Sequence, residues 1–433
     1  MASKKHTIVH IAPHLGGGVG TVMLNYLVKN KNNDSYEHSI YCLDSINNNA
    51  KKVLAKNSIC SKESVSQTPE VLLEAIALAD IIVVHWWNHP LLFEFLVKNE
   101  LPPCRIAFWS HVSGTEAPHI FSHTLFDYPD YFIFTTPMSY LVNEVTTYKK
   151  NHSVFRAIWS TGGLDHIKNI ERKEHTGFNI GYIGTVDYSK MHPHFLKICS
   201  QIDIPDAKYI VCGGGHIEKL QEEVALYGLE DKFKFTGFVE DISPYLEIFD
   251  VFVYPLARNH YGTCDQALAE AMGCGVVPIV LNNNMENYMV HNMYSGIVAA
   301  DEEEFSSAVI EMYQNKGFRD RLSLKAKEEA FRRFSIEETI KEWDYVYFKL
   351  LERNKLVRKW GGKYSGMNVE PYQIFFESLG DYAQIFENGD EVKIQQLADK
   401  SLSWKSKSKG TAHQYATFFQ EDLTLQKISN LMK

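Results

Sequence analysis

The chain has 433 residues, 45% of them hydrophobic and 22% charged, which is the composition of a folded protein and not of a disordered or fibrous chain. At about 150 residues per domain, this length predicts two or three domains. The formal net charge of −9 excludes a strongly basic protein that binds nucleic acid or anionic membranes through its overall charge.

The cysteines and the apolar segments indicate a cytoplasmic protein. The seven cysteines include no C-x-x-C pair, and their odd number fits neither a disulfide framework nor a zinc site. No apolar run approaches the length of about 18 residues that spans a bilayer. We therefore expect a chain without a transmembrane segment, which contacts membranes peripherally if at all.

Short apolar segments alternate with segments of helical periodicity, a pattern typical of parallel sheets covered by helices. The first half of the chain predicts five strands, at residues 7–12, 39–43, 81–85, 105–109 and 131–135. After a polar connection the pattern predicts five more, at residues 179–183, 208–212, 233–236, 251–254 and 276–280. Charged helices up to residue 353 are expected to close the second domain.

The sequence thus predicts an α/β protein with two doubly wound domains and a C-terminal extension. The expected boundaries are 1–165 for the first domain, 166–355 for the second and 356–433 for the extension. The extension is nearly neutral and carries no motif. We therefore favour a packing or oligomerising role for it over an acceptor-binding role.

A glycine-rich loop that includes Gly17 and Gly18 follows the first predicted strand and leads into a helix. Glycines let a backbone approach a ligand, and a helix N-terminus favours an anion. Asp44 follows at a distance compatible with a dinucleotide-binding fingerprint. However, three residues separate the strand from the glycines, where that fingerprint has almost none, so a different ligand is favoured.

Histidines gather after the third and fourth predicted strands. His111 directly follows a strand, where ligands of open α/β sheets bind, so we expect it to be functional. Two interpretations of His85 and His89 stay open, a partly buried loop position and a substrate contact. His119 and His123 are spaced for one helical face, but no third ligand is identifiable by spacing, and we predict no metal site.

Two segments of the second half carry charges in positions suited to a ligand. Lys190 follows a strand and a glycine turn at Gly184, where an ammonium beside backbone amides suits a diphosphate leaving group. A solvated surface lysine is the alternative. Glu270 lies among small apolar residues of a predicted helix, so its carboxylate needs hydrogen-bond donors, and sugar hydroxyls are good candidates.

Together these segments resemble the GT-B glycosyltransferases of the large retaining group called family 4, over residues 6–350. Gly16 to Gly20 resembles the N-terminal glycine loop of the family, and Gly184 to Lys190 resembles its G-R-x-x-x-x-K loop. The segment from Glu270 to Val280 resembles its E-A-M-A-x-G-x-P-V motif. Residues 163–165 and 237–241 give weaker support. The resemblance implies two Rossmann-like domains facing a cleft.

Two positions depart from the family pattern, and both concern the donor site. The family motif predicts an acid eight residues before Glu270, where this chain has Gly262. Asp265 is a candidate substitute. The arginine expected after Gly184 is Thr185, so Lys190 would carry more of the phosphate charge.

The resemblance implies transfer of a sugar from a UDP- or GDP-linked donor to an acceptor hydroxyl on a glycan, lipid-linked or protein-linked molecule. It further implies retained anomeric configuration, no metal ion and no cofactor, and a role in polysaccharide or glycoconjugate biosynthesis. The implied catalytic residues are His111, Lys190, Asp265 and Glu270. The implied donor contacts are Gly17, Gly18, Gly184, Thr185, Lys190, Val239, Thr263, Cys264, Asp265, Gln266 and Glu270. The implied acceptor side includes His85 and Trp87.

An inactive GT-B subunit that binds a partner transferase or a glycan is the main alternative, because both departures touch the donor site. A nucleotide-sugar epimerase of the same fold is less favoured, since its members lack the segment that begins at Glu270 here. Expected partners are therefore a nucleotide-sugar, an acceptor glycan or glycoconjugate, and a second copy or partner transferase, but not nucleic acid.

Overall fold

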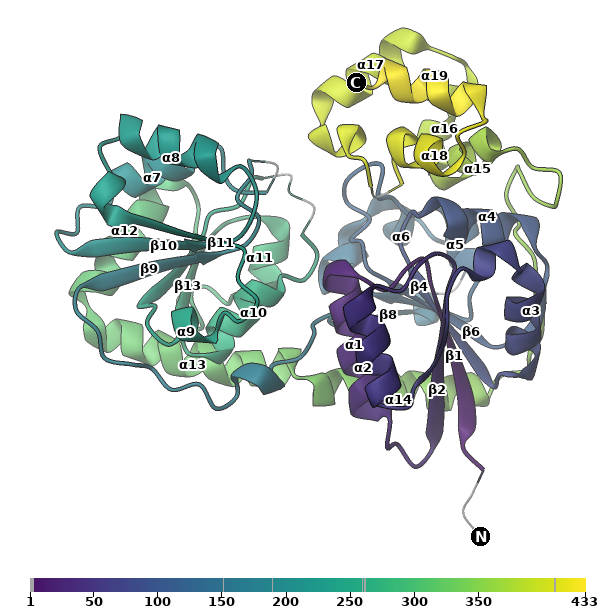
Figure 1. Ribbon diagram of the computed structural model, residues 1–433, viewed down its shortest axis with the longest axis horizontal. Helices are drawn as coiled ribbons and strands as arrows, with labels where there is room; N and C mark the ends of the chain where they lie inside the picture. The colour runs from purple at the N-terminus through teal and green to yellow at the C-terminus, as the bar shows by residue number, and fades with distance from the viewer. Residues whose placement is uncertain (1–3, 151, 189, 259, 261, 409) are drawn as a thin grey trace. The chain divides into compact units, whose positions relative to one another are not determined.

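The computed structural model describes residues 4–150, 152–188, 190–258, 260, 262–408 and 410–433 (Figure 1). The chain forms two compact units, one made of Met1–Gly162 with Thr339–Lys433 and the other of Gly163–Glu338. None of the helices in the described ranges is both long and apolar enough to span a membrane.

The first unit contains a seven-stranded sheet of strand order β3-β2-β1-β4-β6-β7-β8, in which all neighbours pair in parallel. The central strand β4 is buried at every position, as expected for a parallel strand covered on both faces. The strands are β1 His6–Ala12, β2 Tyr36–Cys42, β3 Cys60–Lys62, β4 Ile81–Trp86, β6 Ile106–Ser110, β7 Tyr131–Phe134 and β8 Phe155–Ala157. The helices are α1 Gly17–Asn30, α2 Asn48–Lys56, α3 Pro69–Leu78, α4 Pro90–Lys98, α5 His123–Asp127 and α6 Asn143–Thr146.

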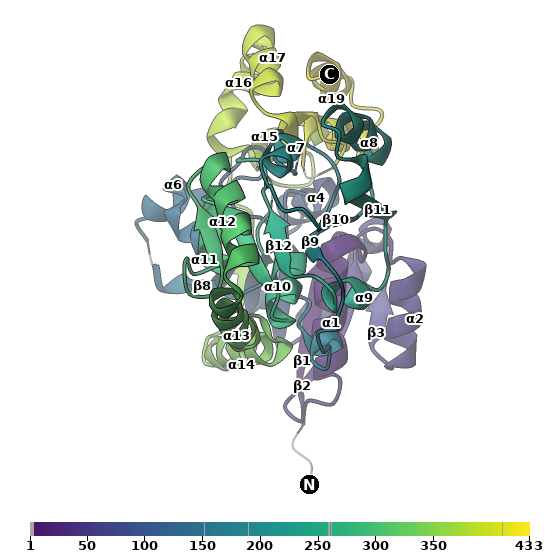
Figure 2. The ribbon, with the colours of Figure 1, turned by 90° about the vertical axis from the view of Figure 1, so that its left-hand side faces the viewer.

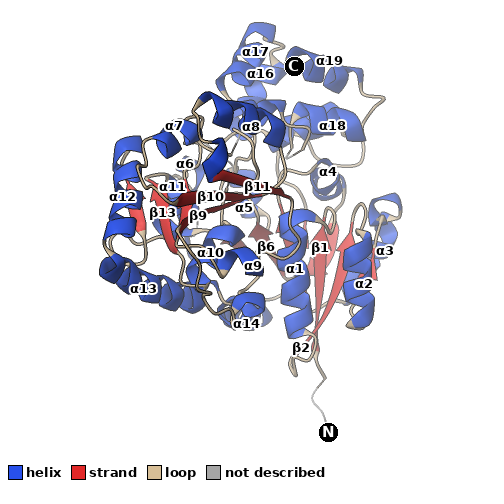
Figure 3. Cartoon of the chain, turned by 60° about the vertical axis from the view of Figure 1, so that its left-hand side comes forward, coloured by secondary structure: helices blue, strands red, loops and turns tan. Residues whose placement is uncertain are grey.

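The second unit contains a six-stranded parallel sheet of order β11-β10-β9-β12-β13-β14. Figure 3 shows helices on both faces of this sheet. The strands are β9 Phe178–Ile183, β10 Ala207–Cys212, β11 Phe233–Gly237, β12 Val251–Tyr254, β13 Val277–Leu281 and β14 Ile297–Ala299. The helices are α7 Phe195–Ser200, α8 Ile217–Leu226, α9 Ser243–Leu246, α10 Gln266–Gly273, α11 Asn284–Met289, α12 Glu302–Gln314 and α13 Lys316–Phe334.

These two sheets confirm the predicted fold class, and all ten predicted strands are present with ends shifted by at most three residues. The apolar pattern of the sequence does not predict β3, β8 and β14, each of three residues, which lie at sheet edges. Short edge strands give too few alternating positions to stand out from loops.

Helix α14, Ile336–Leu351, differs from the expectation that residues up to 353 close the second domain. From Thr339 onward the chain belongs to the first unit. The Tyr347 hydroxyl lies 2.9 Å from the Tyr26 hydroxyl of α1, and Trp343 is fully buried. The aromatic face of α14 therefore completes the core of the first unit.

The C-terminal extension also packs on the first unit. Strand β15, Leu356–Arg358, pairs antiparallel with β5, Leu101–Cys104. The helices that follow gather beside α4 (Figures 1 and 2) and share its hydrophobic core through buried residues such as Phe375 and Tyr415. They are α15 Pro371–Ser378, α16 Ala383–Glu387, α17 Glu391–Lys400, α18 Ala412–Phe418 and α19 Leu423–Leu431.

Candidate functional site

The loops after β9 and β12 place two predicted residues side by side in the second unit. The Lys190 Nζ lies 3.3 Å from Asp265 Oδ1, and the two side chains are only 13% and 12% exposed. The ammonium also lies 5.4 Å from the centre of the Tyr254 ring at the end of β12. Burial raises the pKa of Tyr254, and the neighbouring Asp265 carboxylate adds to that shift, so the phenol stays neutral. The carboxyl edge of the sheet thus holds a largely buried ammonium–carboxylate pair beside a neutral phenol.

The environment of Gly262 gives a physical reason for the acid that is missing from the family pattern. A Cβ at Gly262 would lie 2.8 Å from the His260 ring and 3.2 Å from Asp265 Oδ2, so a larger side chain would collide. The Gly262 amide donates a hydrogen bond of 3.0 Å to His260 Nδ1. The Asp265 carboxylate therefore lies next to the space that the Cβ of an acidic residue at position 262 would occupy.

His260 is itself anchored by an acid that the sequence analysis did not identify. Its Nε2 lies 3.0 Å from a carboxylate oxygen of Glu286, which is fully buried on α11. Burial alone would lower the pKa of His260, but Glu286 outweighs burial and raises it. No motif marks this pair, because 26 residues separate its members. The pair fixes the loop that leads into α10.

Glu270 lies on α10 and already has donors within its own unit. Its Oε1 is 2.9 Å from His166 Nε2 and accepts a second hydrogen bond, also of 2.9 Å, from Gln266 Nε2. Gln266 Nε2 also donates to the Gly163 carbonyl oxygen. The hydrogen bond to Glu270 raises the pKa of His166. A ligand hydroxyl at Glu270 would therefore add to protein donors and would not be the sole partner of the carboxylate.

Three glycines after β10, Gly213 to Gly215, were missed as site residues. A Cβ at Gly213, whose φ is +155°, would lie 1.8 Å from the Gly184 carbonyl oxygen. A Cβ at Gly215 would lie 2.3 Å from the Val186 carbonyl oxygen. The loops after β9 and β10 thus touch through bare backbone, which only glycine permits. Three consecutive glycines directly after a predicted strand are a sequence signal from which this loop could have been predicted.

The other predicted donor contacts of the second unit also follow strands or precede α10. Gly184 comes directly after β9, and the exposed Thr185 accepts a hydrogen bond of 3.0 Å at its carbonyl oxygen from the Tyr182 hydroxyl. Val239 is half-buried after β11. Thr263 and Cys264 precede the helix whose N-cap is Asp265. Their contacts with a nucleotide stay predictions.

In the first unit, Gly17 and Gly18 are exposed at the start of α1, and a Cβ on either would meet no atom within 4 Å. Gly17 has a φ of +63°, a conformation that favours glycine. The loop therefore has open space in front of its backbone, and its predicted contact with a ligand stays a prediction.

His85 is fully buried on β4, and its ring nitrogens lie 3.0 Å from His10 and His111, which favours the buried position over a substrate contact. Its predicted place on the acceptor side stays a prediction. His111 is 8% exposed, and its Nδ1 lies 3.0 Å from the Ser160 hydroxyl. Trp87 is also 8% exposed and lies against the His111 ring edge to face. Their predicted roles remain predictions.

Of the histidines considered as metal ligands, His123 contacts the Glu144 carbonyl oxygen and the Thr147 hydroxyl. A separate group in the second unit, His192, His194 and Glu302, brings one ligand atom each within 4.8 Å. The Lys197 ammonium lies 3.2 Å from Glu302 and would repel a cation there. The sequence pattern did not predict this group.

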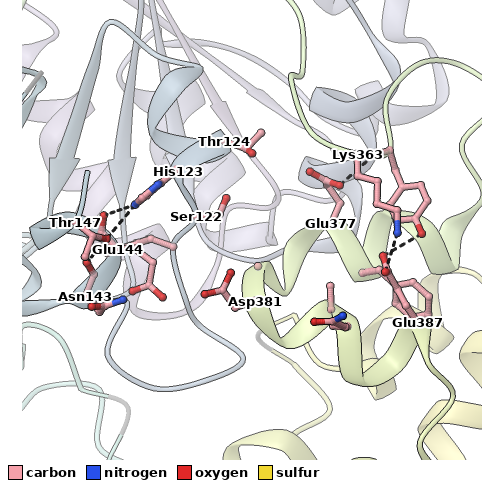
Figure 4. Close-up of a pocket in the computed structure, with 16 residues that line it drawn as sticks. Ser122, His123, Thr124, Asn143, Glu144, Thr147, Lys363, Glu377, Asp381 and Glu387 are labelled. Carbon is pink, nitrogen blue, oxygen red and sulfur yellow. Dashed lines mark hydrogen bonds and ion pairs between the residues drawn. The ribbon is translucent and has the colours of Figure 1, made fainter. Parts of the chain in front are cut away.

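A cavity of about 620 Å³ lies in the first unit between α5, α6 and the extension (Figure 4). Its acids include Glu377, which accepts a hydrogen bond from the Trp360 indole, and Glu387, which pairs with Lys363. None of the predicted site residues lines this cavity. It is therefore distinct from the candidate donor site around Lys190.

Comparisons with known proteins show which family and which fold the chain resembles. Residues 165–329 match the family described as glycosyl transferases group 1. Over 161 residues the chain is 26% identical to a 2-deoxystreptamine N-acetyl-D-glucosaminyltransferase of Niallia circulans, and the match covers 35% of this chain and 40% of that relative.

Two solved structures share the fold at low sequence identity. A glycosyltransferase from Rickettsia africae matches with a TM-score of 0.67 at 13% identity, covering 81% of this chain and 99% of the other. Anabaena HepE in complex with UDP matches with a TM-score of 0.63 at 13% identity, covering 79% and 100%. The chain thus has the GT-B fold, and its residues 165–329 match the glycosyl transferases group 1 family.

Proposed function

We propose that this protein transfers a sugar from a UDP-sugar to an acceptor hydroxyl, with retention of configuration as in family 4 and without a metal ion. The observation that carries the proposal is the Lys190–Asp265 pair, which lies after β9 and at the N-terminus of α10. The UDP in the Anabaena structure and the N-acetylglucosaminyl group named for the Niallia relative support UDP-N-acetylglucosamine as the first donor to test.

In this reaction the bond between the anomeric carbon and the diphosphate oxygen breaks, and a bond from the acceptor oxygen forms. The acceptor proton leaves with the released diphosphate. Negative charge grows on that diphosphate, and the Lys190 ammonium with the backbone amides at the start of α10 would stabilise it. Asp265 holds Lys190 in place and would face the sugar. Glu270 would bind the ribose.

The direct test is release of UDP from UDP-N-acetylglucosamine, UDP-glucose and UDP-galactose, with GDP-mannose as the control for the base. We expect UDP to raise the melting temperature, since a ligand at 100 times its Kd stabilises a protein by about 2.7 kcal/mol. Stabilisation by UDP with no UDP release from any donor, with or without acceptors, would favour the inactive subunit. Preference for the GDP-linked donor would contradict the uridine assignment.

Independence from metal has its own test, because cationic side chains take the place of a divalent ion in the proposal. We expect the rate of UDP release to survive EDTA. Loss of turnover on chelation that Mn²⁺ or Mg²⁺ restores would contradict the role given to Lys190 and leave the transferase assignment intact.

A further inference from the structure

Four buried histidines form a row across the sheet of the first unit. His38 lies on β2, His10 on β1 and His85 on β4, and His111 follows β6, so four neighbouring strands contribute one histidine each to the row. Each histidine of the row is paired with a residue on the neighbouring strand. The histidine that this neighbouring strand contributes lies two positions after the paired residue. A step of two residues keeps side chains on one face. The row therefore runs diagonally across the strands toward the carboxyl edge of the sheet.

The rings in this row are joined by hydrogen bonds of one repeating type. His38 Nδ1 lies 2.9 Å from His10 Nε2, His10 Nδ1 lies 3.0 Å from His85 Nε2, and His85 Nδ1 lies 3.0 Å from His111 Nε2. The row ends where His111 Nδ1 lies 3.0 Å from the Ser160 hydroxyl oxygen. Each link thus joins the Nδ1 of one ring to the next group along the row.

The four imidazoles are uncharged near neutral pH. Burial lowers the pKa of His38 to about 4 and that of His111 to about 3. It lowers the pKa of His10 and His85 well below the ordinary range. A neutral imidazole has one N–H donor and one bare nitrogen acceptor. All the bonds in the row must therefore run in the same direction, because a reversed ring would bring two protons or two lone pairs together.

The end of the row at His38 decides the direction. Its Nε2 is buried and has no hydrogen-bond partner among the residues that the structure describes. Tyr26, which packs edge-on against His38 and His10, uses its hydroxyl to bond Tyr347. If protons sat on Nε2, His38 would bury an N–H without an acceptor, which is rarer in proteins than a buried acceptor without a donor. Protons on Nδ1 avoid this.

We propose that His38, His10 and His85 are positioning residues that hold His111 as the neutral Nδ1–H tautomer, so that it acts as a hydrogen-bond donor and not as a base. With this tautomer the Ser160 hydroxyl oxygen, 3.0 Å from His111 Nδ1, accepts the N–H and marks where an oxygen of a substrate would accept it. The role of His111 in sugar transfer rests on the proposed function. The assignment of its tautomer is independent of that function.

The tautomer can be read without substrate from two-bond ¹H–¹⁵N spectra of the full chain labelled with ¹⁵N-histidine, which separate protonated from bare ring nitrogens. Signals of His10 and His111 are identified by their loss in His10→Phe and His111→Phe. We expect the Nδ1 of both rings to be protonated. Protonated Nε2 on His111, or a doubly protonated ring near pH 7, would overturn the proposal.

The coupling along the row is tested at its far end. His38→Phe removes a donor but supplies no acceptor, so His10 and His111 should both keep the Nδ1 proton. His38→Asp offers an acceptor to His10 Nε2, which should move the protons of His10, His85 and His111 together to Nε2. The proposal requires His10 and His111 to carry their protons on the same nitrogen in every variant. Discordant tautomers in either variant would overturn it.

Kinetics then test the role in transfer. Where His38→Asp has reversed the row, kcat should be lower than in His38→Phe by roughly 2- to 10-fold, the range for one lost hydrogen bond, with UDP affinity equal in both. Equal kcat in the two variants despite reversed tautomers would overturn the positioning role. Absence of UDP release in the unmodified protein would instead count against the proposed function, because the tautomer spectra need no turnover.

Discussion

Lys190 and Asp265 form an ion pair of 3.3 Å although 75 residues separate them in the chain. An ammonium has three N–H donors, and the bond to Asp265 occupies one of them. Lys190 can therefore hold Asp265 and an anionic ligand at the same time. The low exposure of both side chains strengthens the attraction between them, because little water screens the two charges.

Replacing Lys190 with methionine should weaken UDP binding by roughly 10- to 100-fold, since a hydrogen bond to a charged group contributes about 1.5–3 kcal/mol. Calorimetry with UDP measures the effect. Lys208→Met is the matched control, because the Lys208 ammonium bonds only a surface carbonyl oxygen, that of Asp231, in the described contacts. Unchanged UDP affinity in folded Lys190→Met would contradict the phosphate role.

Glu270 and Asp265 should respond differently to loss of charge. If Glu270 binds the ribose, Glu270→Gln should weaken binding of free UDP and of the intact donor by the same factor, roughly 10-fold or more. Asp265→Asn should spare free UDP and reduce turnover, because Asp265 is assigned to the sugar. Calorimetry and initial rates separate these effects. Normal UDP affinity in Glu270→Gln would make Glu270 a structural partner of His166 and Gln266.

Gly213→Ala should disturb nucleotide binding from a loop that the sequence analysis overlooked. The added methyl would lie 1.8 Å from the Gly184 carbonyl oxygen, so the loop after β9 must move. Gly214→Ala is the matched control, because its methyl would lie 3.8 Å from the nearest atom, in Phe238. We expect a loss of UDP affinity of about 10-fold or more in the first variant only. Equal affinities would show that the two loops do not shape the site.

Much of the fold could be predicted because parallel strands are continuous apolar runs. β4 and β12 are buried at every position, and both were found to within one residue. The exposed edge strand β3 has no such run and was missed. The sequence also did not predict which domain α14 belongs to, because its hydrogen bond from Tyr347 to Tyr26 joins residues 321 positions apart. Periodicity predicts a helix but not the domain that it completes.

The site could be predicted only where its functional residues lie within a recognisable sequence motif. Lys190 and Asp265 each lie in a segment that resembles a family motif, so both were identified. The reason for glycine at residue 262 is the His260 ring, which no motif includes. The histidine row depends on strand register, and His38 and His10 were therefore not identified as site residues. Register is a property of the folded sheet and not of any single strand.

The pair of His166 and Glu270 predicts a pH dependence. The hydrogen bond to Glu270 raises the pKa of His166 above its ordinary value of 6.5. The stability from this pair is therefore complete below about pH 6.5 and is lost as the pH rises through the raised value. Glu270→Gln should lower the His166 pKa, measured by NMR titration, while His192 should keep the pKa that burial lowers. An unchanged His166 pKa would contradict the pairing.

The extension is tied to the first unit by a buried ion pair. Arg358 on β15 bonds the Asp130 carboxylate, and the two side chains are 10% and 6% exposed. Asp130 also accepts a hydrogen bond from the Ile106 amide at the start of β6. The pair therefore joins the first residues of the extension to the central sheet.

Arg358→Met should destabilise the first unit by up to about 3–5 kcal/mol, because the buried Asp130 carboxylate then keeps only the longer ion pair to Arg353, of 3.7 Å. Amide hydrogen exchange of β5 and β15 measures the loss locally. Lys393→Met is the control, since the Lys393–Asp390 pair at the start of α17 is solvent-exposed and should contribute little to stability. Adding Asp130→Asn to Arg358→Met should recover part of the protection, because the uncompensated charge is then gone. If Arg358→Met costs no more than Lys393→Met, packing alone holds the extension on the unit.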